Sequence, residues 1–216
     1  MRISPFRAGF LRNFKLEGER VMLRPMRGKD WRQWSRLRAG SRHFLTPWEP
    51  LWASDALTRG AYRQRLKIAN AEGRLGQSYS LHIFLKTEQT LIGAVTLGQI
   101  RRGVAQMGSL GYWIGEPYAQ KGYMSEALGL VLHFAFRDLG LHRIEAACLP
   151  TNLPSQSLLR RMAFREEGLA RRYLRINGEW HDHLLFARLA DDPPVRQVVP
   201  REHPHLRALS GGKEPA

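Results

Sequence analysis

The residues whose types and spacing most clearly suit a binding site form a basic loop, Ala119–Met124, between a β-rich run and a helical segment. The run Leu110–Ile114 alternates residue types at period two, which predicts a strand that ends at Glu116-Pro117. From Ser125 onward, apolar residues recur at helical spacing. A strand, loop and helix in this order leave N–H groups at the helix start without partners, and that site favours an anion such as phosphate.

The composition of the loop indicates a diphosphate ligand. Gly122 lets the backbone approach a bulky diphosphate, and Lys121 adds a positive charge beside it. Each charge-assisted hydrogen bond contributes roughly 1.5–3 kcal/mol, so three or four anchor a cofactor. The loop lacks both the ending of a Walker A motif and the spaced glycines of a dinucleotide fingerprint. By itself, it is also compatible with a purely structural glycine.

Several further segments accompany the loop: Gly111–Ile114, Gln120–Ala127, Leu141–Ala146, Pro150–Asn152, Phe164–Gly168 and Asn177–His183. Together they resemble the acetyl-CoA motif of the GNAT acyltransferases, and most of all the RimJ/RimL group that acetylates ribosomal protein N-termini. The resemblance extends over roughly residues 18–189. It implies an α/β (α+β) domain with the GNAT acyl-CoA N-acyltransferase fold, a mixed, mostly antiparallel central sheet flanked by helices.

The resemblance also implies acetyl-CoA as co-substrate and a set of residues that bind it. These cofactor-binding candidates are Tyr112, Trp113, Ile114, Gln120, Lys121, Gly122, Tyr123, Met124, Ser125 and Asn152. By the same resemblance, Asn152 bonds the pantetheine arm and Ser155 lies near the sulfur, which makes both candidate catalytic residues. The alternative is that Asn152 or Ser155 only caps the helix that Pro154 begins.

The segment Phe44–Trp52 is the candidate wall of the acceptor site. Its two prolines exclude a regular helix, and two tryptophans accompany one carboxylate. In the resembling family, this part of the chain lies over the acceptor groove, so Trp48 and Glu49 become candidates for contacting the incoming amine. The alternative is that the tryptophans serve only for packing.

Acetyl transfer to an amine requires a neutral amine, and Ser109 stands where many GNAT members place a glutamate base. An α-amine with a pKa of about 7.7–8.0 is already roughly 10% neutral at pH 7, whereas lysine, at about 10.4, is neutral about once in 2,500. Weak base catalysis through water by Glu49, Glu116 or Glu126 therefore suffices for an N-terminus. Glu126 also has a simpler explanation as a first-turn carboxylate. Ser155 is the candidate proton donor to the thiolate.

These inferences favour acetylation of a protein N-terminal α-amine, with an N-terminal alanine of a ribosomal protein as the expected acceptor. A first alternative is acetylation of a small amine, an antibiotic or polyamine, although such cations favour an acidic groove. A second alternative is a ribosome- or RNA-binding protein that retained the fold and lost the chemistry. The net charge of +15 favours polyanions such as CoA or ribosomal RNA, but it also fits a solvated basic surface.

Composition limits the remaining possibilities. The 216 residues suffice for a basic arm (1–17), one acetyltransferase domain (18–189) and a Pro-rich, disordered tail (190–216). No apolar run approaches the length of a membrane span, and the single cysteine, Cys148, indicates a reducing compartment. We therefore expect a cytoplasmic monomer or homodimer without membrane contact. The histidines show no metal-binding spacing, so we expect no metal.

The remaining elements follow from periodicity and turn chemistry. Glu19–Pro25 is the first expected strand, and Asp30 is the expected N-cap of the helix that follows. The runs 78–86 and 90–99 read as paired strands, with His82 half-exposed on one face. Near the end of the domain, Asn177-Gly178 predicts a tight hairpin turn.

Overall fold

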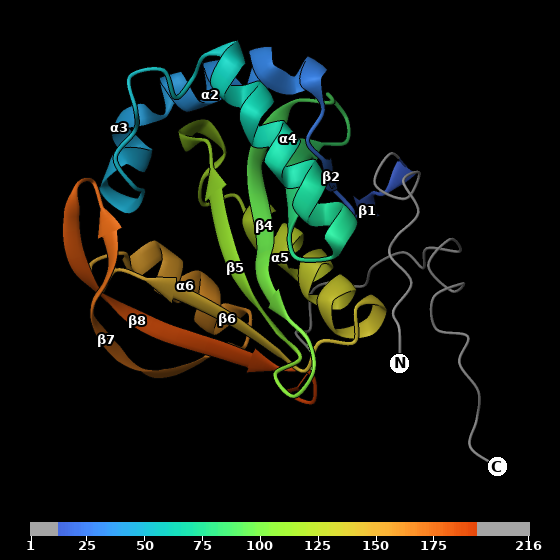
Figure 1. Cartoon of the computed structure of the whole chain (residues 1–216), viewed down its shortest axis with the longest axis vertical. Coiled ribbons are helices and arrows are strands. Elements are labelled where there is room, and N and C mark those ends of the chain that lie inside the picture. Colours follow the sequence, from blue (N-terminus) through green and yellow to red (C-terminus); the bar gives the residue numbers. More distant parts are fainter. Residues whose placement is uncertain (1–12, 194–216) are drawn as a thin grey trace.

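Eight strands form one mixed sheet with helices packed on both of its faces (Figure 1). The computed structural model describes residues 13–193. The strand order is β1-β2-β3-β4-β5-β6-β8-β7. The strands are β1 (Leu16–Glu17), β2 (Val21–Pro25), β3 (Tyr79–Leu85), β4 (Leu91–Arg101), β5 (Met107–Ile114), β6 (Arg143–Cys148), β7 (Arg165–Ile176) and β8 (Glu179–Leu189).

The helices lie in two groups along the chain. Between β2 and β3 are η1 (Gly28–Asp30), α2 (Trp31–Gly40), α3 (Arg42–Leu45), η2 (Thr46–Trp48) and α4 (Arg59–Leu75). Between β5 and β7 are η3 (Glu116–Tyr118), α5 (Tyr123–His133), its π-helical continuation η4 (Phe134–Asp138) and α6 (Leu153–Arg161). Thr58 caps α4 by accepting a hydrogen bond from the Ala61 amide, which defines where that helix begins.

β5 and β6 form the one parallel pair among the strands of residues 13–193. Their pairing runs from Met107↔Arg143 to Leu110↔Ala146 and stops there. β5 itself continues to Ile114, where it is still paired with β4. The two parallel strands therefore diverge after Leu110, and α5 follows the diverging end of β5.

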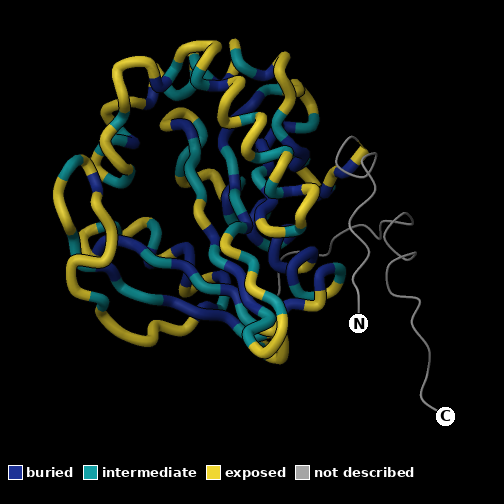
Figure 2. Tube along the Cα trace, viewed as in Figure 1, coloured by how far each residue is buried: buried dark blue, intermediate teal, exposed yellow. Residues whose placement is uncertain are grey.

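Apolar side chains hold the helices to the sheet in two clusters. The larger cluster packs α5 residues such as Leu128 and Leu132 against Ile83 and Leu97 of the central strands. The smaller cluster joins α2 and α4 to the opposite face and consists of Trp34, Tyr62, Phe84 and Leu91. Figure 2 shows the resulting pattern, with buried segments in the central strands and exposed ones at the loops and the hairpin tip.

The fold class and its main elements agree with the sequence predictions. β3 and β4 lie where paired strands were expected, and β7 and β8 form the expected hairpin. Asn177 and Gly178 have φ values of 45° and 92°, the left-handed conformation that a two-residue hairpin turn needs. Of the predicted basic arm (1–17), Leu16–Glu17 form β1. Most of that arm, and of the predicted tail (190–216), lies outside the described residues.

One prediction about an individual residue is wrong, and a second holds for position but not for the side chain. His82 is only 2% exposed rather than half-exposed, because α4 and the buried cluster around Tyr62 cover that face of β3. Asp30 is the N-cap residue of α2, as predicted, but its side chain makes no capping bond to that helix and binds Arg24 instead. Among residues 13–193, no helix has the combined length and apolar content that crossing a bilayer requires.

Candidate active site

The first part of the site is a strand edge that has no neighbour. Gly111–Ile114 pair with β4 on one side of β5, whereas the pairing with β6 on the other side ends at Leu110. The backbone groups of residues 111–114 that face β6 therefore have no strand partner in the described part of the chain. We call them the free edge of β5. Such an edge binds an extended ligand through main-chain hydrogen bonds.

The second part is the turn into α5. Gln120 and Gly122 both have positive φ, at 58° and 81°, and they direct the chain into the helix. Gly122 is the N-cap and provides no capping side chain, so the first N–H groups of α5 are available to a ligand. Lys121 is exposed beside them. This geometry fits the predicted diphosphate site.

Arg20 adds a second positive charge to this loop, and sequence reasoning missed it. Its Nη1 donates to the Lys121 carbonyl at 3.1 Å, and its guanidinium lies 4.9 Å from the centre of the Tyr123 ring. A Cβ added at Gly122 would lie 3.2 Å from Arg20 Nη2. Arg20 is 101 residues from Lys121 in the chain, so no local pattern could have connected them.

Glu126 holds Arg20 in this position. Its carboxylate accepts from the Arg20 amide at 2.8 Å, from the Val21 amide at 3.2 Å and from Arg20 Nε at 3.0 Å. These contacts join the first turn of α5 to the start of β2. Glu126 thus has a structural role, and it is not among the residues that line the acceptor cavity described below.

The third part lies where β5 and β6 diverge, at the start of α6. Asn152 Oδ1 accepts from the Ser155 amide at 3.1 Å and so caps α6, as one of the two sequence interpretations expects. Ser155 Oγ lies 2.8 Å from Tyr112 Oη. Burial raises the pKa of Tyr112 above its ordinary value, so the phenol keeps its proton. Burial also raises the pKa of the nearby Cys148 thiol, and the Ser155 hydroxyl partly offsets this rise.

The fourth part is a cavity of about 670 Å³ between the sheet and the α2–α4 region, which we call the acceptor cavity. Its sheet side is lined by Ser80, His82, Ala94, Thr96, Gly111, Tyr112 and Trp113, and its helical side includes Trp34, Arg38, Glu49 and Trp52. Gly111 and Tyr112 belong both to this lining and to the free edge of β5. The two halves of the site therefore meet at one strand.

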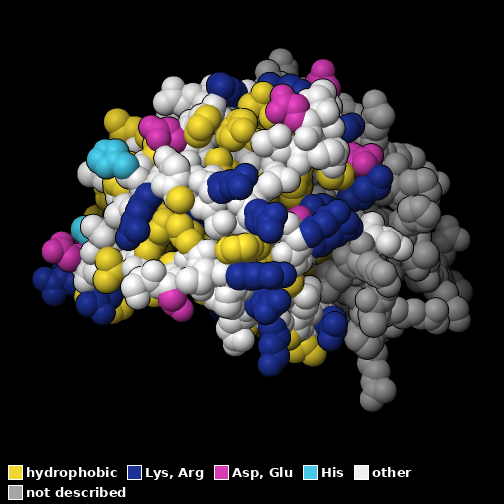
Figure 3. Space-filling view, turned by 90° about the horizontal axis from the view of Figure 1, so that it is seen from above, with side chains coloured by type: hydrophobic (Ala, Val, Ile, Leu, Met, Phe, Trp, Pro, Cys, Tyr) yellow, Lys and Arg dark blue, Asp and Glu magenta, His cyan; other side chains and the backbone are white. Residues whose placement is uncertain are grey.

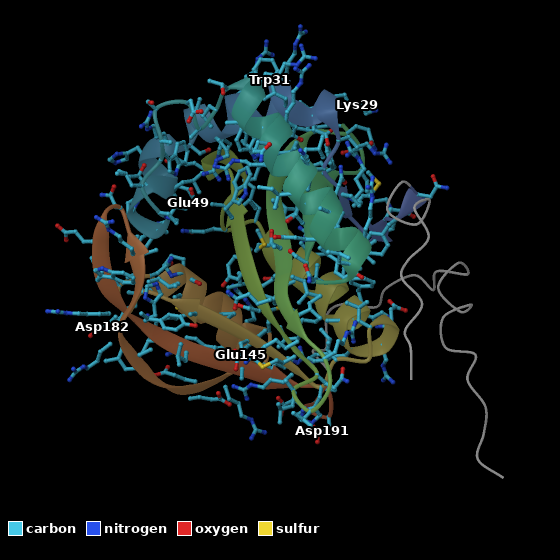
Figure 4. All side chains as sticks on the ribbon, viewed as in Figure 1. Lys29, Trp31, Glu49, Glu145, Asp182 and Asp191 are labelled. Atoms are coloured by element: carbon cyan, nitrogen blue, oxygen red, sulfur yellow. The ribbon has the colours of Figure 1, made fainter. Side chains whose placement is uncertain are left out.

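Glu49 lies in the cavity wall, close to the tip of the β7–β8 hairpin (Figure 4). Both of its carboxylate oxygens bind the Arg38 guanidinium, with Oε1 at 3.1 Å from Nη1, and Oε2 also accepts from Trp52 Nε1 at 2.8 Å. The Glu49 carbonyl accepts from the Asn177 amide at 2.9 Å. Arg38 lies 4.3 Å from the centre of the Trp52 ring. This wall is therefore held in a fixed geometry.

The structure brings most of the predicted site residues together, with two differences. Met124 is 7% exposed and packs in the main core, so only its backbone faces the loop. Trp48 does not line the acceptor cavity, whereas Trp52, from the same predicted wall segment, does. The direction of Trp48 could not be read from a segment without regular periodicity, whereas Met124 lies at helical spacing before Leu128 on the buried face of α5.

A buried polar cluster, also missed by sequence reasoning, extends from the cavity. Arg24 donates to both oxygens of Asp30 at 2.7 and 2.8 Å, the Arg27 amide donates to Oδ2 at 2.8 Å, and His82 Nδ1 lies 3.4 Å from Oδ2. Burial alone would raise the pKa of Asp30, but bonds from Arg24 and His82 keep it well below its usual range. Burial lowers the pKa of His82, against the opposing effect of Asp30.

Comparison with known proteins agrees with this geometry. The chain matches the acetyltransferase (GNAT) domain family over residues 20–165. It is 36% identical over 177 residues to the probable N-acetyltransferase YjcK of Bacillus subtilis, covering 82% of this chain and 98% of that protein. It is 33% identical over 178 residues to the ribosomal protein uS5-alanine N-acetyltransferase of Escherichia coli, covering 82% and 92%.

Two solved structures share the fold and a comparable level of identity. Mycobacterium smegmatis RimJ, in complex with CoA-disulfide, superposes with a TM-score of 0.80 at 34% identity, covering 84% of this chain and 90% of that one. The ribosomal-protein-S5-alanine acetyltransferase of Vibrio fischeri gives 0.78 at 31% identity, covering 83% and 98%. The protein is therefore an N-acetyltransferase of the GNAT family, similar to the RimJ/RimL group.

Proposed function

We propose that this enzyme transfers the acetyl group of acetyl-CoA to the N-terminal α-amine of a ribosomal protein, with alanine as the acceptor residue. One observation carries the proposal: the free edge of β5 and the acceptor cavity meet at Gly111 and Tyr112. An extended donor along the edge and an amine in the cavity would therefore approach each other at the same strand. The relatives named for alanine acetylation support the choice of acceptor.

The residues of this chain fit acetyl-CoA in two places. The free edge of β5 offers N–H and C=O groups to the amides of the pantetheine arm. The start of α5, with Gly122, Lys121 and Arg20, offers amides and positive charge to the diphosphate. When bound, acetyl-CoA supplies a thioester carbonyl that an amine can attack and a thiolate that can leave.

Three features of the site serve the chemical step. The N–H groups of the free edge can polarise the thioester carbonyl, as fixed donors do in other acyl transfers. The hydroxyl pair of Tyr112 and Ser155 can protonate the departing thiolate, and burial keeps the phenol protonated until then. Asn152 fixes the first turn of α6 and so holds Ser155 in place. No covalent enzyme intermediate is needed.

The acceptor cavity is suited to the start of a peptide chain. Its volume of about 670 Å³ falls within the range of small-ligand sites, about 300–1,000 Å³. Its walls are mainly aromatic and aliphatic, and the carboxylate of Glu49 is already neutralised by Arg38. Glu72 also lines the cavity, but Arg65 matches its charge, so the lining has no net negative charge to attract a strongly cationic polyamine. A single α-amine, readily deprotonated, suits this environment better.

A basic surface beside the cavity supports a ribosomal setting for the substrate. The face shown in Figure 3 carries many more Lys and Arg than Asp and Glu side chains. Lys29, Arg32, Arg36, Arg59 and Arg63 are exposed and take part in none of the ion pairs formed within residues 13–193. Like charges spaced four residues apart destabilise a helix slightly, so such rows favour an anionic partner. We include contact with ribosomal RNA in the proposal.

The test uses purified enzyme, acetyl-CoA and synthetic peptides. The panel contains N-terminal peptides of ribosomal proteins that begin with Ala, Ser or Met, a peptide with a blocked N-terminus and an internal Lys, and spermidine. Intact-mass analysis is expected to show one added acetyl group, on the free α-amine of the Ala peptides above all. Acetylation confined to spermidine, or acetyl-CoA binding without any acetylated peptide, would refute the proposal.

A further inference from the structure

His82 lies at the floor of the acceptor cavity although it is almost completely buried. The strand register places Arg24, His82, Ala94 and Trp113 opposite one another on β2, β3, β4 and β5. Residues directly opposite each other in a sheet project from the same face. The His82 ring therefore shares a face with Trp113, roughly 10 Å away across two strand spacings.

The Asp30 carboxylate lies beside one nitrogen of this ring, although His82 Nδ1 makes no hydrogen bond of good geometry within residues 13–193. Asp30 Oδ2 lies 3.4 Å from His82 Nδ1, and the carboxylate is held in place by Arg24 and by the Arg27 amide. A proton on Nδ1 is favoured beside this carboxylate, which leaves Nε2 as the acceptor nitrogen. The imidazole is neutral at pH 7, because burial lowers its pKa.

The surface between His82 and the free edge of β5 carries small or hydroxyl-bearing residues. Ala94, between His82 and Trp113, has only a methyl group. In the adjacent row of the sheet, Ser80 and Thr96 are opposite each other, and their hydroxyls are 3.2 Å apart. Thr96 is in turn opposite Gly111, where a Cβ would meet nothing within 4 Å. Hydroxyl groups thus lead from the exposed backbone of β5 to the strand that carries His82.

We propose that His82 is the proton acceptor for the incoming amine, reached through the Thr96–Ser80 hydroxyl pair, with the nearby Asp30 carboxylate stabilising its imidazolium form. This inference rests on the proposed function. The ammonium group gives up one proton, each hydroxyl passes one on as it receives one, and Nε2 of His82 takes it. The amine lone pair then forms the C–N bond as the C–S bond breaks. As the amide forms, the nitrogen loses a second proton, which offsets the proton that the departing thiolate gains. His82 finally releases the first proton to solvent.

Several charged groups act on His82. Asp30 and Arg24 approach it from η1 and β2, the Tyr62 ring of α4 lies 6.3 Å from the imidazole, and Arg38, Glu49, Arg65 and Glu72 line the rest of the cavity. Asp30 stabilises the imidazolium form, whereas burial and Arg24 oppose it. The ring can thus accept a proton during turnover and lose it again afterwards.

The test is the pH dependence of kcat/KM for an Ala-terminated peptide between about pH 6 and 9. The wild-type profile is expected to be nearly level below the amine pKa, since the enzyme itself deprotonates the ammonium. The His82→Gln variant lacks this base and can use only substrate whose amine is already deprotonated. Its kcat/KM is therefore expected to fall about tenfold per pH unit below pH 8. Relative to wild type, the kcat/KM of His82→Gln is expected to be about 30-fold lower at pH 6.5 and almost the same at pH 9. Its acetyl-CoA affinity is expected to be unchanged.

Two further variants keep the inference falsifiable if His82→Gln does not fold. Thr96→Val keeps the side-chain shape, removes one hydroxyl and is expected to steepen the profile in the same way. His43→Gln, an exposed histidine on α3, is the matched control and is expected to keep the level profile. The role of His82 is overturned if kcat/KM does not vary with pH in both His82→Gln and Thr96→Val, or if both variants lose the same fraction of kcat/KM at every pH. A wild type that yields no acetylated peptide overturns the proposed function as well.

Discussion

Tyr112 and Ser155, which are 43 residues apart in the chain, share a hydrogen bond of 2.8 Å where β5 and β6 diverge. The contact joins the free edge of β5 to the first turn of α6. It also adds a second candidate proton donor, because the Tyr112 phenol shares this bond and burial keeps it protonated. Ser155 then orients the donor in addition to being a candidate itself.

Tyr112→Phe tests this pair directly. We expect kcat to fall about 100-fold while the affinity for acetyl-CoA changes little, since only the proton donor is lost. Ser155→Ala leaves the phenol in place and is expected to have a smaller effect. Because the pKa of Tyr112 is raised, its ionisation produces no loss of wild-type rate up to about pH 10. Stopped assays of thiol release across pH would measure both effects, and an unchanged kcat in Tyr112→Phe would remove the residue from the mechanism.

Gly122→Ala tests the diphosphate site. Any Cβ here is strained at φ 81° and approaches Arg20 Nη2 to 3.2 Å, so the loop conformation becomes less favourable and the Arg20 side chain has to move by a few tenths of an ångström. We expect the Kd for acetyl-CoA to rise at least about tenfold, which corresponds to about 1.4 kcal/mol of binding free energy. Gly140→Ala is the matched control, because Gly140 has φ 62° with open space around it. Calorimetry that gave equal affinities for the two variants would argue against the loop assignment.

Gly111→Val tests the acceptor cavity. The new side chain enters open space beside Thr96, so the variant is expected to fold and to occupy part of the cavity. The KM for an Ala-terminated peptide is expected to rise about tenfold or more, while acetyl-CoA still binds. Gly98→Ala on β4 is the control, because its Cβ makes only ordinary contacts of 3.5 Å or more. Peptide KM values that were equal in both variants would place the acceptor elsewhere.

Asp30→Ala tests the buried cluster through stability. The substitution leaves Arg24 buried without its partner, so we expect a loss of about 3–5 kcal/mol in the free energy of unfolding. The pKa of Asp30 is depressed in the folded state, so its contribution is fully present above the unfolded value, near 3.8, and is lost as the pH falls further. Urea titrations at pH 7 and pH 3 would show the gap between wild type and variant narrowing in acid. Asp55→Ala, at an exposed position, is the control and should leave the free energy of unfolding unchanged at both pH values.

Local features of this protein are readable from its residues alone. The strand, loop and helix from Leu110 onward, the paired runs of β3 and β4 and the turn at Asn177-Gly178 are where periodicity and turn chemistry predict them. Each depends on neighbours within a few positions, because backbone geometry and amphipathic spacing are local properties. The family resemblance is local too, since it rests on short motifs.

Only the tertiary structure decided which side chains meet. Strand pairing places His82 opposite Arg24 and Ala94, and the packing of α4 buries it where its sequence neighbours suggested exposure. The start of β2 brings Arg20 to a loop 101 residues away. In the irregular segment before α4, packing turned Trp52 toward the cavity rather than Trp48. These contacts depend on how elements distant in the chain pack together, and no local pattern of residue types specifies that.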